Sequence, residues 1–303
     1  MRPGSGARMR ITIFGTGALG CLFGARLARV AQVTLVGTWA EALAAVDARG
    51  ILLEEGAESR TVRVGTARLG ARVPAADLVL VLVKSWQTAG IVPHLGPALG
   101  EGGAALTLQN GLGNLERLGP GVAGGVTTEG ATLLGPGHVR AGGSGPTVVA
   151  APEWAAGLLR RAGFDVRRCA PGEVRAHLWG KLAVSCGINA VTALLGVPNG
   201  ELLARPAAEE MMVRAARECA RVAESAGIRL PFADAAEEAR AVAARTAANR
   251  SSMLQDLLRG GPTECDAIQG AVAAEGARRG VPTPVNGMLW LLLRAATEGK
   301  GNR

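Results

Sequence analysis

The 303-residue sequence predicts an α/β protein in which a doubly wound N-terminal domain precedes an all-helical domain. In the first half, short apolar strands alternate with segments of helical spacing. From about Glu173 onward, long segments show helical spacing with almost no alternation of β-branched residues. The Pro171-Gly172 pair interrupts the chain between these two patterns, so we expect domains over residues 9–171 and 172–303.

Strand and helix signals in the first half follow one another as in repeated β-α-β units. A strand at Arg10–Phe14 leads into a glycine-rich turn and a helix that reaches about Val30. The further expected elements are a strand at Val33–Val36, a helix at Trp39–Arg49, a hairpin from Ile51–Glu54 and Arg60–Val64, and buried strands at Asp77–Val83, Leu106–Gln109, Thr147–Ala150 and Asp165–Arg168. We expect the glycine-rich segments Gly119–Gly125 and Gly135–Gly145 to be turns between short strands.

The second half predicts helices, and three prolines lie near their boundaries. The expected helices cover Val174–Leu195, Glu201–Ala226, Phe232–Ala248 and Thr263–Arg279. We expect Trp179, Met211, Met212 and the run Trp290–Leu293 to be core or subunit-contact residues, which leaves a homodimer open.

Composition excludes several classes of protein. A hydrophobic content of 48% argues against disorder, and the longest purely apolar stretches are too short to span a bilayer. The polar N-terminal segment, residues 1–8, does not resemble a signal peptide. The five cysteines form no CxxC pair, and no His, Cys or Asp spacing suggests a metal site. We therefore expect a cytoplasmic protein with reduced thiols that binds neither a membrane nor a metal.

The charge balance favours a small anionic partner. Thirty-three cationic side chains against 25 acidic ones give a net charge of +8, but the arginines are spread along the chain. Tyrosine is absent and phenylalanine is scarce, so the chain offers no aromatic platform for stacking nucleic-acid bases. A positive cleft would instead concentrate small anions.

A Gly-x-Gly-x-x-Gly string directly follows the first strand and opens the first helix, which is the context that a Rossmann-type dinucleotide site requires. The expected cofactor-binding residues of this turn are Gly15, Thr16, Gly17, Ala18, Leu19 and Gly20. The second strand is followed by Gly37, Thr38 and Trp39, without the acid that holds the ribose hydroxyls in NAD sites, which favours NADP. Because no arginine occurs at positions 37–40 to bind a 2′-phosphate, NAD is the alternative.

Lysine is rare in this sequence, which uses arginine for nearly every positive charge. The three lysines are Lys84, Lys181 and Lys300, the last in an expected C-terminal tail. A retained lysine suggests a position that needs a compact, titratable ammonium. Lys84 ends an apolar strand and Asn110 follows the next one, so both should reach the sheet edge where ligands bind.

One predicted helix carries a polar stripe. Helical spacing places Lys181, Ser185, Ile188 and Asn189 on one side of the segment Val174–Leu195. A wholly structural helix would not bury such polar groups without partners. The stripe therefore favours a helix face that meets a ligand, although a solvated amphipathic face is the alternative.

These segments, taken in order, resemble the ketopantoate reductase (2-dehydropantoate 2-reductase) family over nearly the whole chain. Besides the glycine string, the resemblance is carried by Val83–Gln87, Gln109–Gly113, Trp179–Asn189, Pro198–Leu202, Ser251–Asp256 and Thr263–Asp266. It implies a Rossmann domain, an all-helical domain and an active site between them. The implied activity is the NADPH-dependent reduction of 2-dehydropantoate to (R)-pantoate on the route to pantothenate and coenzyme A.

The resemblance also implies roles for single residues. Lys181 matches the general acid and Glu264 matches the glutamate beside it. Lys84 and Asn110 match groups that flank the nicotinamide and the substrate, and the matched substrate-binding positions are Asn110, Asn189, Asn199 and Ser252. Two positions depart from the family pattern: Ser185 stands where many members have asparagine, and Thr38 stands where an arginine for the 2′-phosphate is often found.

We therefore expect an NADPH-dependent oxidoreductase that acts on a small branched 2-oxo acid, with 2-dehydropantoate as the first candidate. Ser185, counted among the expected substrate contacts, keeps open a paralogue that reduces another 2-oxo acid. A sensor that binds NADP without turnover is a third hypothesis. The retained Lys181, Glu264 and Asn110 argue against the sensor, because binding alone needs no proton donor.

Overall fold

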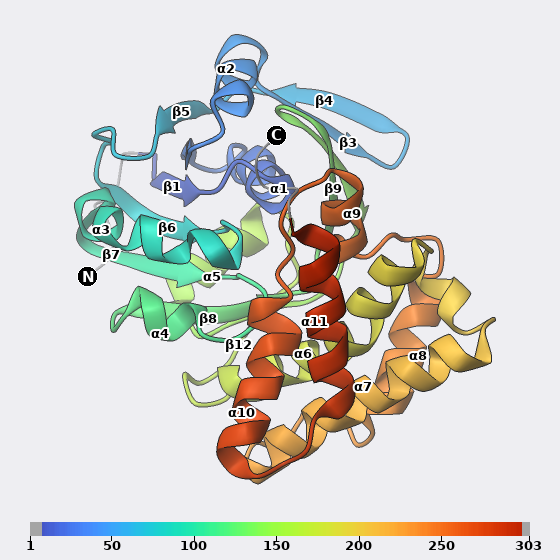
Figure 1. Cartoon of the computed structure of the whole chain (residues 1–303). Helices are drawn as coiled ribbons and strands as arrows, with labels where there is room; N and C mark the ends of the chain where they lie inside the picture. Colours follow the sequence, from blue (N-terminus) through green and yellow to red (C-terminus); the bar gives the residue numbers. More distant parts are fainter. Residues whose placement is uncertain (1–7, 299–303) are drawn as a thin grey trace. The chain divides into compact units, whose positions relative to one another are not determined.

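The computed structural model describes residues 8–298 and contains two compact units (Figure 1). The first unit comprises the chain through Gln109 and Asn114–Val174, and the second comprises Asn110–Gly113 and the chain from Arg175 onward. Residues 1–7 of the polar N-terminal segment and Lys300 lie outside the described residues, and so do the expectations for them.

A predominantly parallel sheet forms the framework of the first unit. Its order is β12-β11-β8-β7-β6-β1-β2-β5, and within it β5-β2-β1-β6-β7-β8 has the Rossmann order 3-2-1-4-5-6. The bounds are β1 Arg10–Phe14, β2 Gln32–Gly37, β5 Gly65–Arg68, β6 Ala76–Val81, β7 Leu99–Thr107, β8 Val122–Thr127, β11 Thr147–Val149 and β12 Val166–Arg168. This arrangement confirms the predicted fold class and puts the switch in strand order between β1 and β6, beside the glycine-rich turn.

Both faces of this sheet are covered, which explains why its central strands read as continuous apolar runs. One face packs with α1 (Ala18–Leu27) and α5 (Glu153–Arg161) around Ile13, Leu35 and Leu80. The other face packs with α3 (Thr88–Ala98) and α4 (Asn114–Leu118). The expected helix after β2 is present as α2 (Ala40–Arg49).

A second sheet of four strands also belongs to the first unit, in the order β4-β3-β10-β9. The predicted hairpin forms β3 (Ile51–Glu55) and β4 (Glu58–Val62), and β9 (Gly130–Gly135) and β10 (His138–Gly143) complete the sheet.

The expectation that Gly135–Gly145 is a turn was therefore wrong, since β10 occupies most of it, and β8 takes the last part of Gly119–Gly125. Gly130 pairs with Gly143 across a register shift, and a Cβ on Gly130 would come within 3.1 Å of the Gly142 backbone. Here glycine permits close strand approach and does not end the strand.

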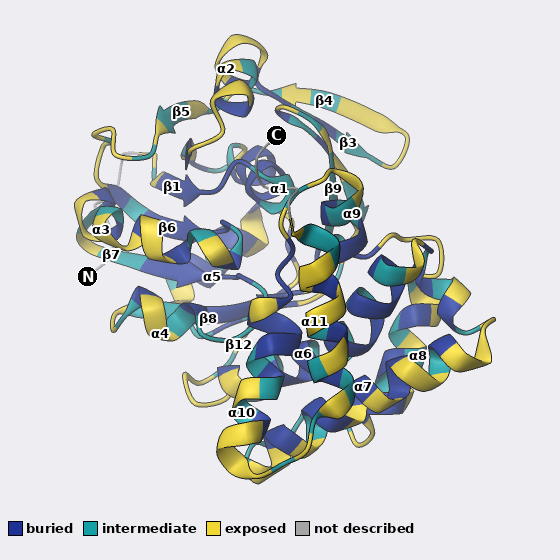
Figure 2. Cartoon of the chain, viewed as in Figure 1, coloured by how far each residue is buried: buried dark blue, intermediate teal, exposed yellow. Residues whose placement is uncertain are grey.

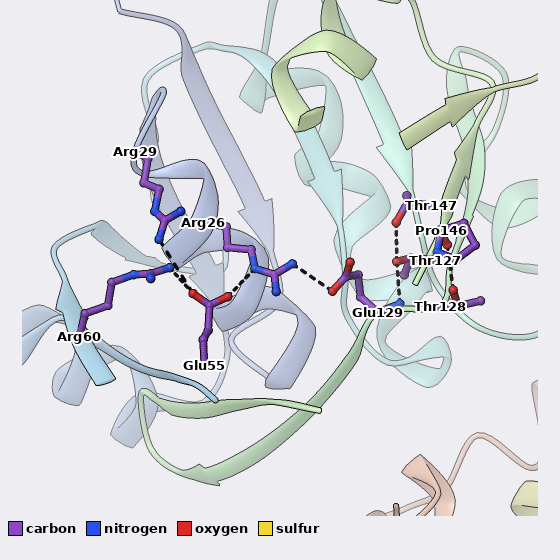
Figure 3. A network of polar contacts seen from close by, with 9 residues as sticks. All are labelled: Arg26, Arg29, Glu55, Arg60, Thr127, Thr128, Glu129, Pro146 and Thr147. Carbon is purple, nitrogen blue, oxygen red and sulfur yellow. Dashed lines mark hydrogen bonds and ion pairs between the residues drawn. The ribbon is translucent and has the colours of Figure 1, made fainter. Parts of the chain in front are cut away.

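A buried arginine on α1 connects the second sheet to the rest of the first unit (Figure 3). The Arg26 guanidinium donates from Nε to Oε1 of Glu55 at 2.8 Å and from Nη1 to Oε2 of Glu129 at 3.0 Å. The Glu129 side chain is only 1% exposed, and burial raises its pKa while Arg26 opposes that rise. The guanidinium also lies 4.9 Å from the ring centroid of Phe164.

The second unit is helical, with buried and exposed residues alternating along its helices (Figure 2), and its core includes residues of α6 (Val174–Leu195). The bounds of α6 match those of the predicted helix. The other helices are α7 Pro206–Ser225, α8 Ala235–Arg245, α9 Ser252–Leu258, α10 Ala271–Arg279 and α11 Pro284–Thr297, with short turns at Asn199–Leu202 and Asp266–Gly270. Helix α6 is long and apolar enough to cross a membrane by length and composition alone, but 61% of its most apolar window is buried inside the protein, as in the core helix of a globular unit.

The expected core residues of the second unit divide into two groups. Trp179, Met212 and Leu293 are fully packed in its core, whereas Met211, Leu291 and Leu292 are exposed. Only part of the apolar run on α11 therefore serves the core.

Replacing Arg26 with methionine should lower the free energy of unfolding by about 3–5 kcal/mol, because it leaves the buried Glu129 carboxylate without its cation. Without Arg26, burial should raise the pKa of Glu129 further. A carboxyl pKa above its unfolded value makes stability fall as the pH rises toward that pKa, so the loss relative to wild type should be smaller at pH 5 than at pH 8. Urea denaturation at both pH values measures this.

A matched control is Arg167→Met, since the Arg167–Asp165 pair is largely exposed and should cost less than about 1 kcal/mol. Adding Glu129→Gln to Arg26→Met should restore much of the loss. Equal destabilisation by Arg26→Met and Arg167→Met would contradict the role given to the buried pair.

Candidate active site

The glycine-rich turn after β1 holds α1 tightly against the end of the strand. The amide of Gly15 donates to the Val36 carbonyl at 2.8 Å, and Gly15 has a φ of +131°, a conformation that favours glycine. At Gly20, a Cβ would lie 2.1 Å from the Gly15 carbonyl oxygen. Only glycine therefore allows the helix to start this close to the strand.

Gly17 differs from these two glycines because the space beside it is open. A Cβ at Gly17 would meet no heavy atom within 4 Å, and Gly17 is the N-cap of α1 without a side-chain cap of its own. The first turn of α1 contains no acidic residue. Free amides, the positive end of the helix dipole and open space together fit the pyrophosphate of a dinucleotide, so the predicted residues Gly15 to Gly20 can hold this group.

Thr38 follows the end of β2 and is exposed. The preceding Gly37 lies against the glycine-rich turn, since a Cβ there would come 2.9 Å from Cγ2 of Thr16. The end of β2 and the turn thus adjoin each other, as a ribose site beside a pyrophosphate site requires.

Lys84 lies three residues beyond β6 and begins the short 3-10 helix Ser85–Gln87. Its backbone amide donates to Oε1 of Gln87 at 3.2 Å, and its ammonium lies 5.8 Å from the ring centroid of Trp86. Lys84 therefore belongs to the carboxyl edge of the parallel strands, as the sequence indicates.

A buried polar network behind Lys84 was missed by the sequence analysis. Gln109 donates from Nε2 to the Val83 carbonyl at 3.0 Å and to Oγ1 of Thr88 at 2.8 Å. The Thr88 hydroxyl in turn donates to Oδ1 of Asn114 at 2.9 Å. Gln109 and Thr88 are buried, so the network fixes the chain on both sides of Lys84. Its only signal in the sequence is a polar residue at the end of an apolar strand.

The second unit brings together three predicted site residues from distant parts of the chain. The Lys181 ammonium donates to Oδ1 of Asn110 at 2.6 Å, and Nδ2 of Asn110 donates to Oε2 of Glu264 at 3.3 Å. Lys181 is half-buried on α6, and Glu264 is buried just before the turn Asp266–Gly270. The result is a hydrogen-bonded series of ammonium, amide and carboxylate.

The position of Asn110 is fixed by the residues that follow it. Gly111 has a φ of +80°, and a Cβ there would come 2.5 Å from the Ala267 carbonyl oxygen. The amide of Leu112 donates to the same carbonyl at 2.9 Å. This close packing explains why the segment Asn110–Gly113 belongs to the second unit although it follows β7 in the chain.

Glu264 is held by an irregular helix. The backbone at Asp266–Gly270 forms a π-helical turn, and the Glu264 carbonyl accepts from the amides of Ala267 and Ile268. Gln269, fully buried, donates to the Cys186 carbonyl on α6 at 3.5 Å. Such π-turns are frequent at functional sites because they re-aim a side chain. No pattern in the sequence indicates this turn.

Burial lowers the pKa of Lys181 from 10.5 to about 8, and the negative charge of Glu264 opposes this change. Desolvation disfavours the ammonium, whereas a nearby carboxylate favours it. With a pKa near 8, Lys181 is mostly protonated at neutral pH and can still release its proton. That combination suits a general acid.

The remaining predicted polar residues follow the same helix or its neighbours. Ser185 and Asn189 lie one and two turns beyond Lys181 on α6, and both are half-buried. The side chain of Asn199 is buried and donates to Oγ1 of Thr246 at 2.9 Å, so the structure ties it to the segment after α8 and not to Lys181.

Ser252 begins α9, and a contact that the sequence analysis missed holds this end of the helix. The hydroxyls of the fully buried Thr192 and of Ser251 are hydrogen-bonded to each other at 2.7 Å, and the Ser251 hydroxyl accepts from the amide of Leu254 as the N-cap of α9. Thr192 also contacts the Asn189 carbonyl at 3.2 Å. The start of α9, with Ser252, is therefore fixed to the turn of α6 that carries Asn189.

Two family models match the chain and cover both units. The model described as "Ketopantoate reductase PanE/ApbA" matches residues 11–154, and the one described as "Ketopantoate reductase PanE/ApbA C terminal" matches residues 173–297.

Relatives and solved structures agree with these matches. A protein named 2-dehydropantoate 2-reductase from Halobacterium salinarum is 38% identical, covering 95% of this chain and 99% of its own, and one of the same name from Archaeoglobus fulgidus is 35% identical, covering 96% and 98%. A crystal structure of a PanE/ApbA family ketopantoate reductase from Ralstonia eutropha has a TM-score of 0.88 at 33% identity, covering 96% of this chain and 99% of its own. A structure of D-mandelate dehydrogenase with NADH and anilino(oxo)acetate has a TM-score of 0.88 at 25% identity, with the same coverage.

Two glycine substitutions should separate binding from folding. Gly17→Ala places a methyl group in open space, so the thermal unfolding midpoint should stay close to that of wild type while dinucleotide affinity falls at least tenfold, since the methyl group occupies the approach to the amides. Gly20→Ala forces the turn apart and should lower the midpoint markedly. Calorimetry and thermal unfolding of the two variants check this. Unchanged affinity in a folded Gly17→Ala protein would argue against the site.

Proposed function

Because the chain belongs to the ketopantoate reductase family and is an oxidoreductase, we propose that it reduces 2-dehydropantoate to (R)-pantoate with NADPH, and that Lys181 is the general acid. The observation that carries this proposal is the hydrogen-bonded series of Lys181, Asn110 and Glu264. A site that only binds a nucleotide has no need of a titratable ammonium held in this way.

The first unit supplies the residues that would hold the cofactor. A nicotinamide dinucleotide, when bound, supplies the hydride that reduces a ketone. The amides of the glycine-rich turn and the N-terminus of α1 would hold its pyrophosphate, and Thr38 would face its adenosine ribose. The backbone at Lys84 is fixed by Gln87 and by the network around Gln109, so its ammonium would contact polar groups of the dinucleotide at the carboxyl edge of β6.

The second unit supplies the proton. As a ketone is reduced, its oxygen becomes an alkoxide, and the Lys181 ammonium would donate a proton to it. Asn110 orients the ammonium through Oδ1, while Glu264 holds the Asn110 amide and raises the pKa of Lys181 against the effect of burial. Proton transfer leaves a neutral amine, which the buried surroundings favour.

The polar stripe of α6 and the start of α9 would hold the substrate. A 2-oxo acid carries a carboxylate that needs hydrogen-bond donors, and Ser185, Asn189 and Ser252 offer hydroxyl and amide groups. Asn199 already donates a hydrogen bond to Thr246, so we propose that it fixes the segment around it. Its buried Oδ1, which has no hydrogen-bond partner within the described residues, would accept from a ligand.

A second candidate is the reduction of another 2-oxo acid on the same scaffold. The D-mandelate dehydrogenase structure with NADH and anilino(oxo)acetate has the same fold as this chain at a TM-score of 0.88. Ser185 has a shorter hydrogen-bonding side chain than asparagine and would leave room for a different substituent on the substrate.

We also propose a cytoplasmic location, since the five cysteines are all free thiols: Cys21, Cys169, Cys186, Cys219 and Cys265.

The reaction is tested by following NADPH oxidation with a panel of 2-oxo acids. We expect the highest kcat/KM for 2-dehydropantoate, with bulkier and unbranched acids lower. Turnover of other 2-oxo acids without 2-dehydropantoate would favour the second candidate. No turnover with any of them would favour a binding protein.

Lys181→Ala should lower kcat by about two to four orders of magnitude, the usual loss for a general acid. In the wild type, kcat/KM for reduction should fall above pH 8, because the reactive form is the ammonium and its pKa is about 8. Stopped-flow or steady-state assays between pH 6 and 10 measure this profile. An unchanged kcat in Lys181→Ala would remove Lys181 from the mechanism.

Glu264→Gln should move the alkaline inflection below that of wild type, since it removes the negative charge that raises the pKa of Lys181. The matched control is Glu224→Gln, which neutralises an exposed acid on α7 and should leave the inflection in place. A common inflection in all three proteins would show that the titrating group is not Lys181.

A further inference from the structure

We propose that Arg68, at the end of β5, recognises the 2′-phosphate of NADP and supplies the cation that is missing at Thr38. The inference rests on the proposed use of NADP and concerns a residue that the sequence analysis did not select. Its basis is the register of two neighbouring parallel strands.

Arg68 lies beside the end of β2 although 30 residues separate it from Thr38. Strands β2 and β5 are parallel, and their register pairs Gly37 with Arg68. The amide of Leu69 donates to the Gly37 carbonyl at 2.9 Å, which fixes this pairing beyond the last strand residue. Arg68 therefore occupies the carboxyl edge of the sheet next to the position where dinucleotide sites bind the adenosine ribose.

Arg68 also lies on the face of the sheet that carries the glycine-rich turn. Paired residues of adjacent strands point to the same face, so Arg68 shares the direction of a Cβ at Gly37. A Cβ built on Gly37 in that direction would lie 2.9 Å from Cγ2 of Thr16, which belongs to the turn. The next pair of residues, Val36 and Ala67, points the other way and packs into the core on the opposite face.

The guanidinium of Arg68 is available for a ligand. The side chain is exposed and, within residues 8–298, enters no ion pair and no side-chain hydrogen bond. Arg72 is exposed four residues further along and adds a second positive charge, while the first acid after β2 is the exposed Glu41 in the first turn of α2. An arginine fork suits a phosphate, which it can hold through two parallel hydrogen bonds.

The exposed Trp39 offers a flat apolar surface beside this position. It directly follows Thr38 and is 37% exposed at the N-cap of α2. A large aromatic side chain left in solvent at a ligand-binding sheet edge suits the adenine ring. Base, ribose and 2′-phosphate would thus contact Trp39 and Thr38, just beyond β2, and Arg68 at the end of β5.

The test compares two fragments of the cofactor on the full-length protein. Titration calorimetry with adenosine 2′,5′-bisphosphate and with AMP reports the contribution of the 2′-phosphate alone. We expect the wild type to bind the bisphosphate at least tenfold more tightly than AMP. In Arg68→Ala this ratio should fall by about tenfold to a hundredfold, the usual size of a charged hydrogen bond to phosphate, with AMP affinity nearly unchanged.

Two further variants control for charge and for side-chain geometry. Arg49→Ala removes an exposed arginine from the far end of α2, about 15 Å from Trp39 along the helix, and should keep the wild-type ratio. Arg68→Lys should retain part of the preference for the bisphosphate over AMP, because a lysine keeps the positive charge but cannot form two parallel hydrogen bonds to the phosphate.

Each result supports or overturns the inference. A wild-type ratio near one would overturn it and favour NAD, and an equal loss of both fragments in Arg68→Ala would show that Arg68 merely supports the strand. The reductase proposal is judged separately by turnover of 2-oxo acids. A protein without turnover whose bisphosphate affinity depends on Arg68 would overturn the reductase and leave this inference standing.

Discussion

The hydrogen bond from the Lys181 ammonium to the Asn110 side chain is the interaction on which the chemistry proposed for the second unit depends. A charge on an apolar helix is costly unless it is compensated, and here the compensation passes through an amide. Asn110 accepts from Lys181 through its oxygen and donates to Glu264 through its nitrogen, so both ends of the amide are used and its orientation is determined. The carboxylate therefore acts on the ammonium both by its charge and through a fixed dipole.

If Lys181 is the proton donor that we propose, this arrangement explains why a chain so rich in arginine has a lysine at position 181. An arginine would satisfy Asn110 and Glu264 equally well as a charge, but it does not release a proton in the accessible pH range. Burial and the Glu264 carboxylate act in opposite directions on Lys181 and leave its pKa at about 8. An ammonium that is stable at neutral pH and still acidic enough to give up a proton requires both effects at once.

The sequence predicted the elements whose signals are local. The bounds of α6 were correct because an uninterrupted apolar period of 22 residues defines them, and the glycine string was correctly placed between β1 and α1. The family followed from short motifs in the right order. In each case, residues close together in the sequence are sufficient to predict the feature.

Features that depend on distant contacts could not be predicted in this way. The second sheet pairs β3 with β10, which are more than eighty residues apart, and its glycines were taken for turns because close strand approach leaves no trace in a single segment. The attachment of Asn110–Gly113 to the second unit depends on a contact with Ala267, which lies in a turn of irregular helix. The hydroxyl of Thr192 was passed over because its partner, Ser251, is remote in sequence.

The same reasoning applies to the cofactor. Positions 37–40 include the last residue of β2 and those that follow it, yet a ligand at a sheet edge contacts the ends of adjacent strands equally well. Parallel pairing brings Gly37 and Arg68 side by side, and because Gly37 has no side chain, Thr16 of the glycine-rich turn packs directly against it. An arginine at the end of β5 places a positive charge at the same edge of the sheet as an arginine after β2 would. A threonine at position 38 is therefore as compatible with a phosphorylated ribose as an arginine there, provided that the neighbouring strand supplies the charge.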